Sequence, residues 1–170
     1  MKFLIIQLIG AIGFGILMLS YHKKEKKQIL LMQIIAYLIF TLHFYLLNGI
    51  TGAMCNFLGF LALTSIYFSN KLQKLNEKII VYIFVVGIIV INLITYQNIF
   101  TIFPIIAAVI AIISFLMEDE NEIRKIGIIS TLCWLVYAVV YKSYISIIFE
   151  LTTLISVFIA YIKNTKTAKT

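Results

Sequence analysis

Residues 133–150 read CWLVYAVVYKSYISIIFE, and this stretch decides how the chain can fold. It belongs to a long apolar run, residues 126–162, whose only clear interruption is Lys142 and Ser143. A single helix over that run would be about 55 Å long at 1.5 Å per residue, whereas the hydrocarbon of a bilayer is about 30 Å thick. We therefore expect two helices joined by a two-residue turn, with Glu150 inside the second helix.

The composition is that of an integral membrane protein. The chain has 170 residues, of which 62% are hydrophobic and 12% are charged, and its mean hydropathy is +1.06. Soluble domains contain about 45–50% apolar and about 25% charged residues, so this chain lacks the polar side chains that a water-facing surface needs. Its apolar runs are continuous rather than alternating, which argues against a transmembrane β-barrel.

Short polar gaps divide the chain into seven apolar segments. Each is close to the length of about 20 residues that a spanning helix requires. The predicted spans are residues 3–21, 28–47, 52–70, 79–96, 100–117, 126–141 and 143–162. The predicted fold class is therefore all-α, a polytopic membrane protein with seven transmembrane helices in one domain.

The basic residues predict the orientation. Lys and Arg favour the cytoplasmic side of short loops. With seven spans, one face receives twelve of the 14 basic residues, and the other receives only Lys2 and Lys142. We expect the N-terminus outside, the C-terminus in the cytoplasm, and contact between the cytoplasmic lysines and anionic membrane lipids. Because topology accounts for the net charge of +7, we expect no nucleic-acid partner.

The sequence also contains an internal pattern. When the chain is shifted by 94 residues, the first span falls on the fifth, the second on the sixth and the third on the seventh, while the fourth has no partner. We predict two three-helix units, residues 1–75 and 99–170, joined by a connecting helix within 76–98. One connecting span gives both units the same orientation, a parallel 3+1+3 repeat of the kind found in transporters that bind solute between the repeats.

Two short motifs carry a resemblance to known families. WLVYA at 134–138 looks like the W-x-x-Y-G stretch that ends the middle span of each unit in SWEET and PQ-loop proteins, and NFLG at 56–59 looks like their Asn-x-x-Gly. The chain lacks the proline–glutamine pair, and Glu150 stands where the second asparagine would be. Through its loop lengths and the paired stretches HFYLLNG and CWLVY, the chain resembles the YgjV family of bacterial inner-membrane proteins. The resemblance implies a SWEET-like fold and a general transport activity.

Glu150 is the acidic residue that lies far from any polar gap. An ionised carboxylate at the bilayer centre costs about 3 kcal/mol on insertion scales, and such groups usually face the bundle interior or an aqueous cavity. The 94-residue shift places Glu150 on Asn56, so both are candidate solute ligands. Three interpretations of Glu150 stay open. It binds solute or carries a coupling proton, it is a structural acid bonded to Asn56, His43 or Tyr137, or it lines a vestibule with no special role.

Three more residues are candidate solute ligands. His43 can titrate near physiological pH, and Trp134 and Tyr137 lie one helical turn apart on one face. Each has a structural alternative: His43 as a helix cap or a partner of an aromatic hydroxyl, and the two aromatic residues as packing or as part of an interfacial belt. For Asn56 the alternative is an ordinary hydrogen bond between helices.

Pro104 and Gly10 fall on each other in the shifted alignment and are candidate hinges. Proline removes a backbone donor and can kink a helix, and a flexible point in both first helices of the units would suit rocking between outward and inward states. The alternative is that Pro104 lies in a first helical turn, where proline is well tolerated, and that the glycine is a packing residue.

These patterns predict a small-solute transporter of SWEET-like type that works by alternating access, with a sugar or another small polar metabolite as solute and a proton as the candidate coupling ion. The alternative is a non-transporting membrane scaffold or regulator on the same fold. We expect no enzyme activity, cofactor or metal, because the sequence has no zinc spacing, phosphate loop or catalytic triad. Cys55 and Cys133 are expected to pack inside spans without a disulfide, and the sequence carries no signal for oligomeric state.

Overall fold

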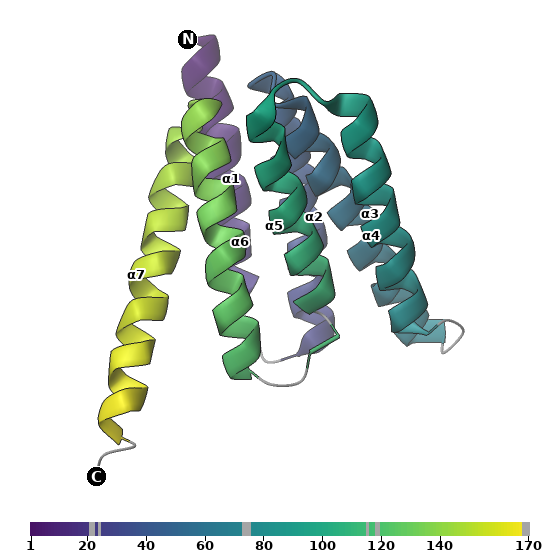
Figure 1. The fold of residues 1–170 in the computed structure, drawn as a ribbon, viewed down its shortest axis with the longest axis vertical. Coiled ribbons are helices and arrows are strands. Elements are labelled where there is room, and N and C mark those ends of the chain that lie inside the picture. The colour runs from purple at the N-terminus through teal and green to yellow at the C-terminus, as the bar shows by residue number, and fades with distance from the viewer. Residues whose placement is uncertain (21–22, 24, 73–75, 115, 118–119, 168–170) are drawn as a thin grey trace.

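A computed structural model describes residues 1–20, 23, 25–72, 76–114, 116–117 and 120–167. Within these residues the chain forms seven α-helices and one short 3₁₀ helix, as the sequence predicts for the all-α class. They are α1 Lys2–Ser20, α2 Lys26–Leu46, α3 Ile50–Leu72, α4 Glu77–Thr95, η1 Ile99–Thr101, α5 Ile102–Ser114, α6 Glu120–Val140 and α7 Tyr144–Thr167. Successive helices run in opposite directions, so the two termini lie at opposite ends of the bundle (Figure 1).

The helices are those of a multi-pass membrane protein. Four of them, α1 to α4, are long and apolar enough to cross a bilayer. In α5, α6 and α7 the apolar stretches among the described residues are shorter, at Ile99–Ser114, Lys125–Val140 and Tyr144–Ile155. Many large apolar side chains are exposed, for example Ile83 and Leu93 on α4. Exposed apolar surface of this extent is what lipid chains cover in a membrane protein.

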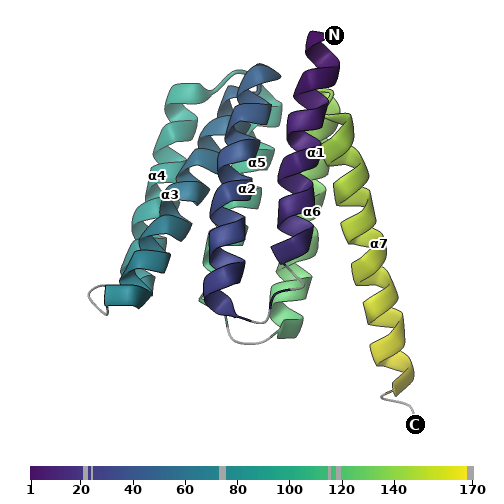
Figure 2. The same ribbon diagram turned by 180° about the vertical axis from the view of Figure 1, so that it is seen from behind.

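Six of the helices form a closed ring, and α4 lies outside it. Around the ring, α1 packs on α2, α2 on α3, α3 on α5, α5 on α6, α6 on α7, and α7 returns to α1. The main contacts of α4 are with α3 and α5. Figure 1 shows α5 and α6 in front of α2 and α1, and Figure 2 shows the same ring from behind.

A short turn after α6 is confirmed, but it contains three residues, 141–143, rather than the two predicted, because Tyr141 also lies outside the helix. Helix α6 ends at Val140 and α7 begins at Tyr144. Lys142 has a φ of 55°, and Asn48, in the turn between α2 and α3, has a φ of 61°. A residue in the left-handed region is a common way to end a helix. The turns at 47–49 and 141–143 share the same backbone hydrogen bonds, shifted by 94 residues: Gly49 N–H donates to Phe44, and Ser143 N–H donates to Ala138, both at 2.9 Å.

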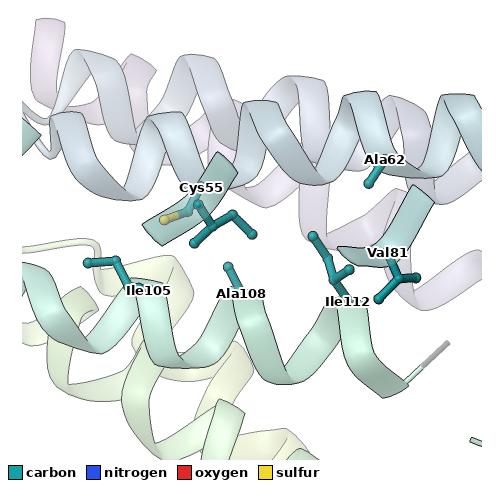
Figure 3. Close-up of a cluster of buried hydrophobic side chains, with 7 residues drawn as sticks. Cys55, Ala62, Val81, Ile105, Ala108 and Ile112 are labelled. Carbon is teal, nitrogen blue, oxygen red and sulfur yellow. The ribbon is translucent and has the colours of Figure 1, made fainter. Parts of the chain in front are cut away.

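Helix α4 is held against the ring by an apolar cluster. Figure 3 shows Cys55 and Ala62 of α3, Val81 of α4, and Ile105 and Ala108 of α5 gathered at one interface, together with Ile112. These side chains are all buried. The two cysteines, Cys55 and Cys133, are buried thiols that form no disulfide.

Contact between α1 and α2 depends on a small residue, and this gives the first prediction. A Cβ added to Gly13 would lie 2.6 Å from the ring of Phe40, whereas one added to Gly15 would meet nothing within 4 Å. Gly13→Ala should therefore lower the melting temperature of the purified protein, at a cost of about 1–3 kcal/mol for overpacking. Gly15→Ala on the same helix is the matched control and should leave it unchanged or raise it, since alanine favours a helix. Equal effects of the two substitutions would contradict this packing.

Candidate functional site

A cavity of about 190 Å³ lies within the ring. Every ring helix contributes to its lining, for example through Phe14 of α1, Tyr37 of α2, Asn56 of α3, Ala108 of α5, Trp134 of α6 and Glu150 of α7. None of the described lining residues comes from α4. The cavity is larger than the engineered cavity of about 150 Å³ that binds benzene in another protein. It is therefore large enough for a small organic molecule.

Glu150 is the one charged residue among those that the structure shows lining the cavity. It is 8% exposed. Among the described residues, none forms a hydrogen bond or an ion pair with its carboxyl group. Its three suggested structural partners bond elsewhere: Asn56 Nδ2 donates to the Gly52 carbonyl at 2.8 Å, and His43 and Tyr137 have the partners described below. The carboxyl group is thus buried, unpaired within the described chain, and at the wall of a cavity.

Aromatic pairs in the cavity wall join one half of the ring, α1–α3, to the other half, α5–α7. Phe44 of α2 stacks on Trp134 of α6, with ring centroids 5.5 Å apart. Phe14 of α1 stacks on Phe149 of α7, with centroids 4.2 Å apart. All four rings line the cavity. Each pair therefore contributes both to the wall and to the contact between helices that are distant in sequence.

His43 is fully buried and does not line the cavity. Its Nδ1 lies 2.9 Å from the Ile6 carbonyl oxygen, and its Nε2 lies 2.7 Å from the Ser143 hydroxyl. A carbonyl only accepts, so Nδ1 carries the proton and Nε2 accepts from Ser143. The Ser143 oxygen is also bonded to the Ser146 hydroxyl, which then donates to it. Because Ser146 lines the cavity, a chain of hydrogen bonds runs from the cavity wall to His43.

Tyr137, the residue that the 94-residue shift places on His43, is also fully buried outside the lining. Its hydroxyl accepts from the Gly52 N–H at 2.9 Å. This N–H is in the first turn of α3, where backbone donors lack a partner within the helix. His43 of α2 thus reaches the start of α7, and Tyr137 of α6 reaches the start of α3. The structure brings Glu150, Asn56 and Trp134 to the cavity and places these two residues at contacts between the halves.

The two candidate hinges have different surroundings. Pro104 is the third residue of α5 and is buried, with its ring in the first helical turn. Gly10 lies in the middle of α1, where an added Cβ would be 2.7 Å from both the His43 ring and the Ile145 side chain. Gly10 therefore allows His43 to approach α1. A hinge role for either residue stays a prediction.

The sequence belongs to a known family. A family of proteins described as bacterial inner membrane proteins, Imp-YgjV, matches residues 4–168. This chain is a member of the YgjV family. The resemblance inferred from its motifs is thereby confirmed for that family, together with a multi-pass location in the bacterial inner membrane. No curated protein and no solved structure matches the chain.

Six polar lining residues of this YgjV-family protein belong to none of the predicted sites, namely Gln33, Tyr37, Ser130, Thr131, Ser146 and Thr153. Two of them have a signal in helical spacing. Ser146 and Thr153 are four residues before and three residues after Glu150, so they share its face of α7. The 94-residue shift offers a second signal, because Tyr37 falls on Thr131.

Many residues that lie 94 positions apart in the sequence line the cavity together. Seven pairs of lining residues are separated by 94 positions: Phe14 and Ala108, Leu17 and Ala111, Tyr37 and Thr131, Phe40 and Trp134, Cys55 and Phe149, Asn56 and Glu150, and Gly59 and Thr153. These account for fourteen of the nineteen lining residues. Residues 94 positions apart therefore not only align in the sequence but also lie in the wall of the same cavity.

The contact between Tyr137 and α3 gives the second prediction. Tyr137→Phe keeps the ring but leaves the Gly52 N–H without its acceptor, and an unmade buried hydrogen bond costs about 1–3 kcal/mol. We expect a lower melting temperature in detergent than for wild type. The matched control is Tyr45→Phe, because Tyr45 is an exposed tyrosine in the last turn of α2. This substitution should have little effect on the melting temperature. A Tyr137→Phe protein as stable as its control would show that this hydrogen bond contributes nothing.

Proposed function

We propose that the protein is a small-solute transporter that works by alternating access, and that its solute binds in the ring cavity. The observation that carries the proposal is the composition of the cavity wall, which draws on α1, α2 and α3 and on α5, α6 and α7 while α4 stays outside. A site at the interface of two units is the arrangement on which alternating access depends. The wall combines apolar rings with polar side chains, as small-molecule sites generally do.

We further propose that the two three-helix groups are a parallel repeat, residues 1–75 and 99–170, joined by α4 within 76–98. Adding 94 to the bounds of α2 gives the bounds of α6, and adding 94 to the first residue of α3 gives the first residue of α7. The contacts between the groups, α3 with α5 and α1 with α7, exchange under the same shift. All seven helices would then cross the membrane, since α6 and α7 are 21 and 24 residues long, and α5 is extended by η1.

In this proposal, hydrogen bonds between the units close one end of the bundle. This is the end at which α2 and α6 finish and α3 and α7 begin. There His43 bonds to Ser143, and Tyr137 bonds to Gly52. Gln7 of α1 reinforces them: its Nε2 donates to the Lys142 carbonyl at 3.0 Å, and its Oε1 accepts from the N–H of Ile145 at 3.2 Å. These contacts would break when the end opens, and the energy of remaking them would help to return the transporter to the closed state.

We assign Glu150 and Asn56 as the polar centre of the solute site. They occupy equivalent positions on α7 and α3, and both are buried at the cavity wall. A carboxyl group without a protein partner can bind a solute directly, or it can take up a proton when the solute leaves. Trp134 adds an aromatic wall, while His43 and Tyr137 act through the contacts between the units rather than by touching solute.

The third prediction tests transport. We expect a thermal-shift screen of sugars, polyols, amines, amino acids, nucleosides and carboxylates to find a solute that raises the melting temperature of the purified protein by mass action. The effect should be lost in Glu150→Gln and in Asn56→Ala. Glu25→Gln, which removes an exposed carboxylate instead, is the control and should retain it. The same solute should show saturable uptake into proteoliposomes.

A scaffold or regulator predicts a different result in that screen. No solute would shift the melting temperature of wild type, and no uptake would occur. Glu150→Gln would then change only the stability of the protein. That combination would contradict the transporter proposal.

The fourth prediction tests the proposed orientation, with the N-terminus outside and the lysine-rich face against anionic lipids of the cytoplasmic leaflet. In a background of Cys55→Ala and Cys133→Ala, a single cysteine at Lys2→Cys should react with a membrane-impermeant maleimide on intact spheroplasts. One at Lys23→Cys should react only after the membrane is permeabilised, because basic loops stay in the cytoplasm. The opposite pattern of labelling would show that the orientation is reversed.

A further inference from the structure

We propose that the ring cavity binds a small organic ammonium ion, a solute with one positive charge, apolar substituents on or near the nitrogen, and no carboxylate. This inference rests on the proposed transport function and names the chemical class of its solute.

The charge of the cavity comes from a single side chain. Glu150 is buried in the wall, and no described residue pairs with it. The described lining residues include no lysine, arginine or histidine. A carboxylate removed from water is stabilised when a cation approaches it, so a cationic solute supplies the partner that the lining lacks. A carboxylate or phosphate on the solute would meet Glu150 with no basic side chain to offset the repulsion.

Aromatic rings form much of the remaining wall. Six lining residues are aromatic: Phe14, Tyr37, Phe40, Phe44, Trp134 and Phe149. They come from α1, α2, α6 and α7, so both halves of the ring contribute. The face of an aromatic ring attracts a cation within about 6 Å, most strongly for tryptophan, and quaternary ammonium groups are recognised in this way. The same rings pack against methyl and methylene groups, which a hydrated inorganic cation does not have.

Eight of the nineteen lining residues have polar side chains, and several of these groups already bond within the protein. Asn56 donates to a carbonyl of α3 at 2.8 Å, and Ser130 donates to a carbonyl of α5 at 3.1 Å. The Ser146 hydroxyl is bonded to Ser143. A sugar carries many hydroxyls, and each one buried without a partner costs free energy. An ammonium ion with alkyl substituents needs little beyond a counter-charge and apolar contact, which is what this wall provides.

The test compares choline with its carbon isostere, in which a carbon atom replaces the quaternary nitrogen, on the purified full-length protein. Binding is measured by calorimetry and thermal shift in detergent, and flux is measured in proteoliposomes. We expect choline to bind at least about tenfold more tightly than the isostere, since one charge distinguishes them. Tetramethylammonium should compete with choline, whereas potassium ions and glucose at equal concentration should not.

Variants locate the binding in the cavity. Glu150→Gln and Trp134→Leu should each weaken choline binding at least about tenfold, and Glu25→Gln, which removes an exposed carboxylate, should leave it unchanged. If either cavity variant fails to fold, the comparison of the charged and uncharged isosteres on wild type still decides the question.

Each outcome has a defined meaning. Equal binding of choline and the isostere, no choline binding to folded protein, or equal competition by potassium ions would overturn the inference. Saturable flux of a sugar or polyol that choline does not inhibit would also overturn it while leaving the transport function standing. Charge-dependent choline binding that requires Glu150, without any flux, would support the ligand class and contradict transport.

Discussion

The structure depends on one constraint: a polar group inside a bilayer must find its partner within the protein, because no water is there to replace it. In this chain the partners lie across the ring. His43 bonds to Ser143, and Tyr137 accepts from Gly52, in each case between helices far apart in sequence. These bonds fix the starts of α3 and α7 against the opposite group of helices. The ring closes around a cavity because the polar groups are satisfied at its end and the aromatic pairs meet across its middle.

In the proposed parallel repeat, α1–α3 and α5–α7 share a backbone plan but carry different side chains at positions 94 residues apart. Where α6 carries Tyr137, the facing turn and helix start have Gly49 and Gly52, and a Cβ at either position would collide with the tyrosine side chain. Where α2 carries the shorter His43, the facing positions, shifted by 94 residues, are serines that supply hydroxyls. A long side chain therefore faces glycines, and a short one faces hydrogen-bonding side chains. The cavity wall also differs between positions 94 residues apart, since it is neutral at Asn56 and acidic at Glu150.

Helix α4 has a separate part in this arrangement. It returns the chain across the bundle, so that the second group of helices starts on the same side as the first. Its buried face packs through Val81 and Ile88 into the cluster of α3 and α5, and its other side is exposed and apolar. Since none of the described lining residues comes from α4, sequence changes on its lipid-facing side should leave the chemistry of the cavity unaltered.

The amino-acid sequence by itself determined that the chain lies in a membrane, where its helices form, and that Glu150 and Asn56 align when the sequence is shifted by 94 residues. The apolar composition requires a membrane environment. The apolar run of residues 126–162 is too long for one spanning helix, so it requires a turn near Lys142 and Ser143. The tertiary structure alone decided which faces of the helices point inward. It placed His43 and Tyr137 at contacts between α1–α3 and α5–α7. It also brought Ser146 and Thr153 to the cavity wall. The reason is physical: in a membrane protein the lipid-facing side and the packed side of a helix are both apolar, so periodicity does not distinguish them, and only contact with the neighbouring helices shows which side is buried.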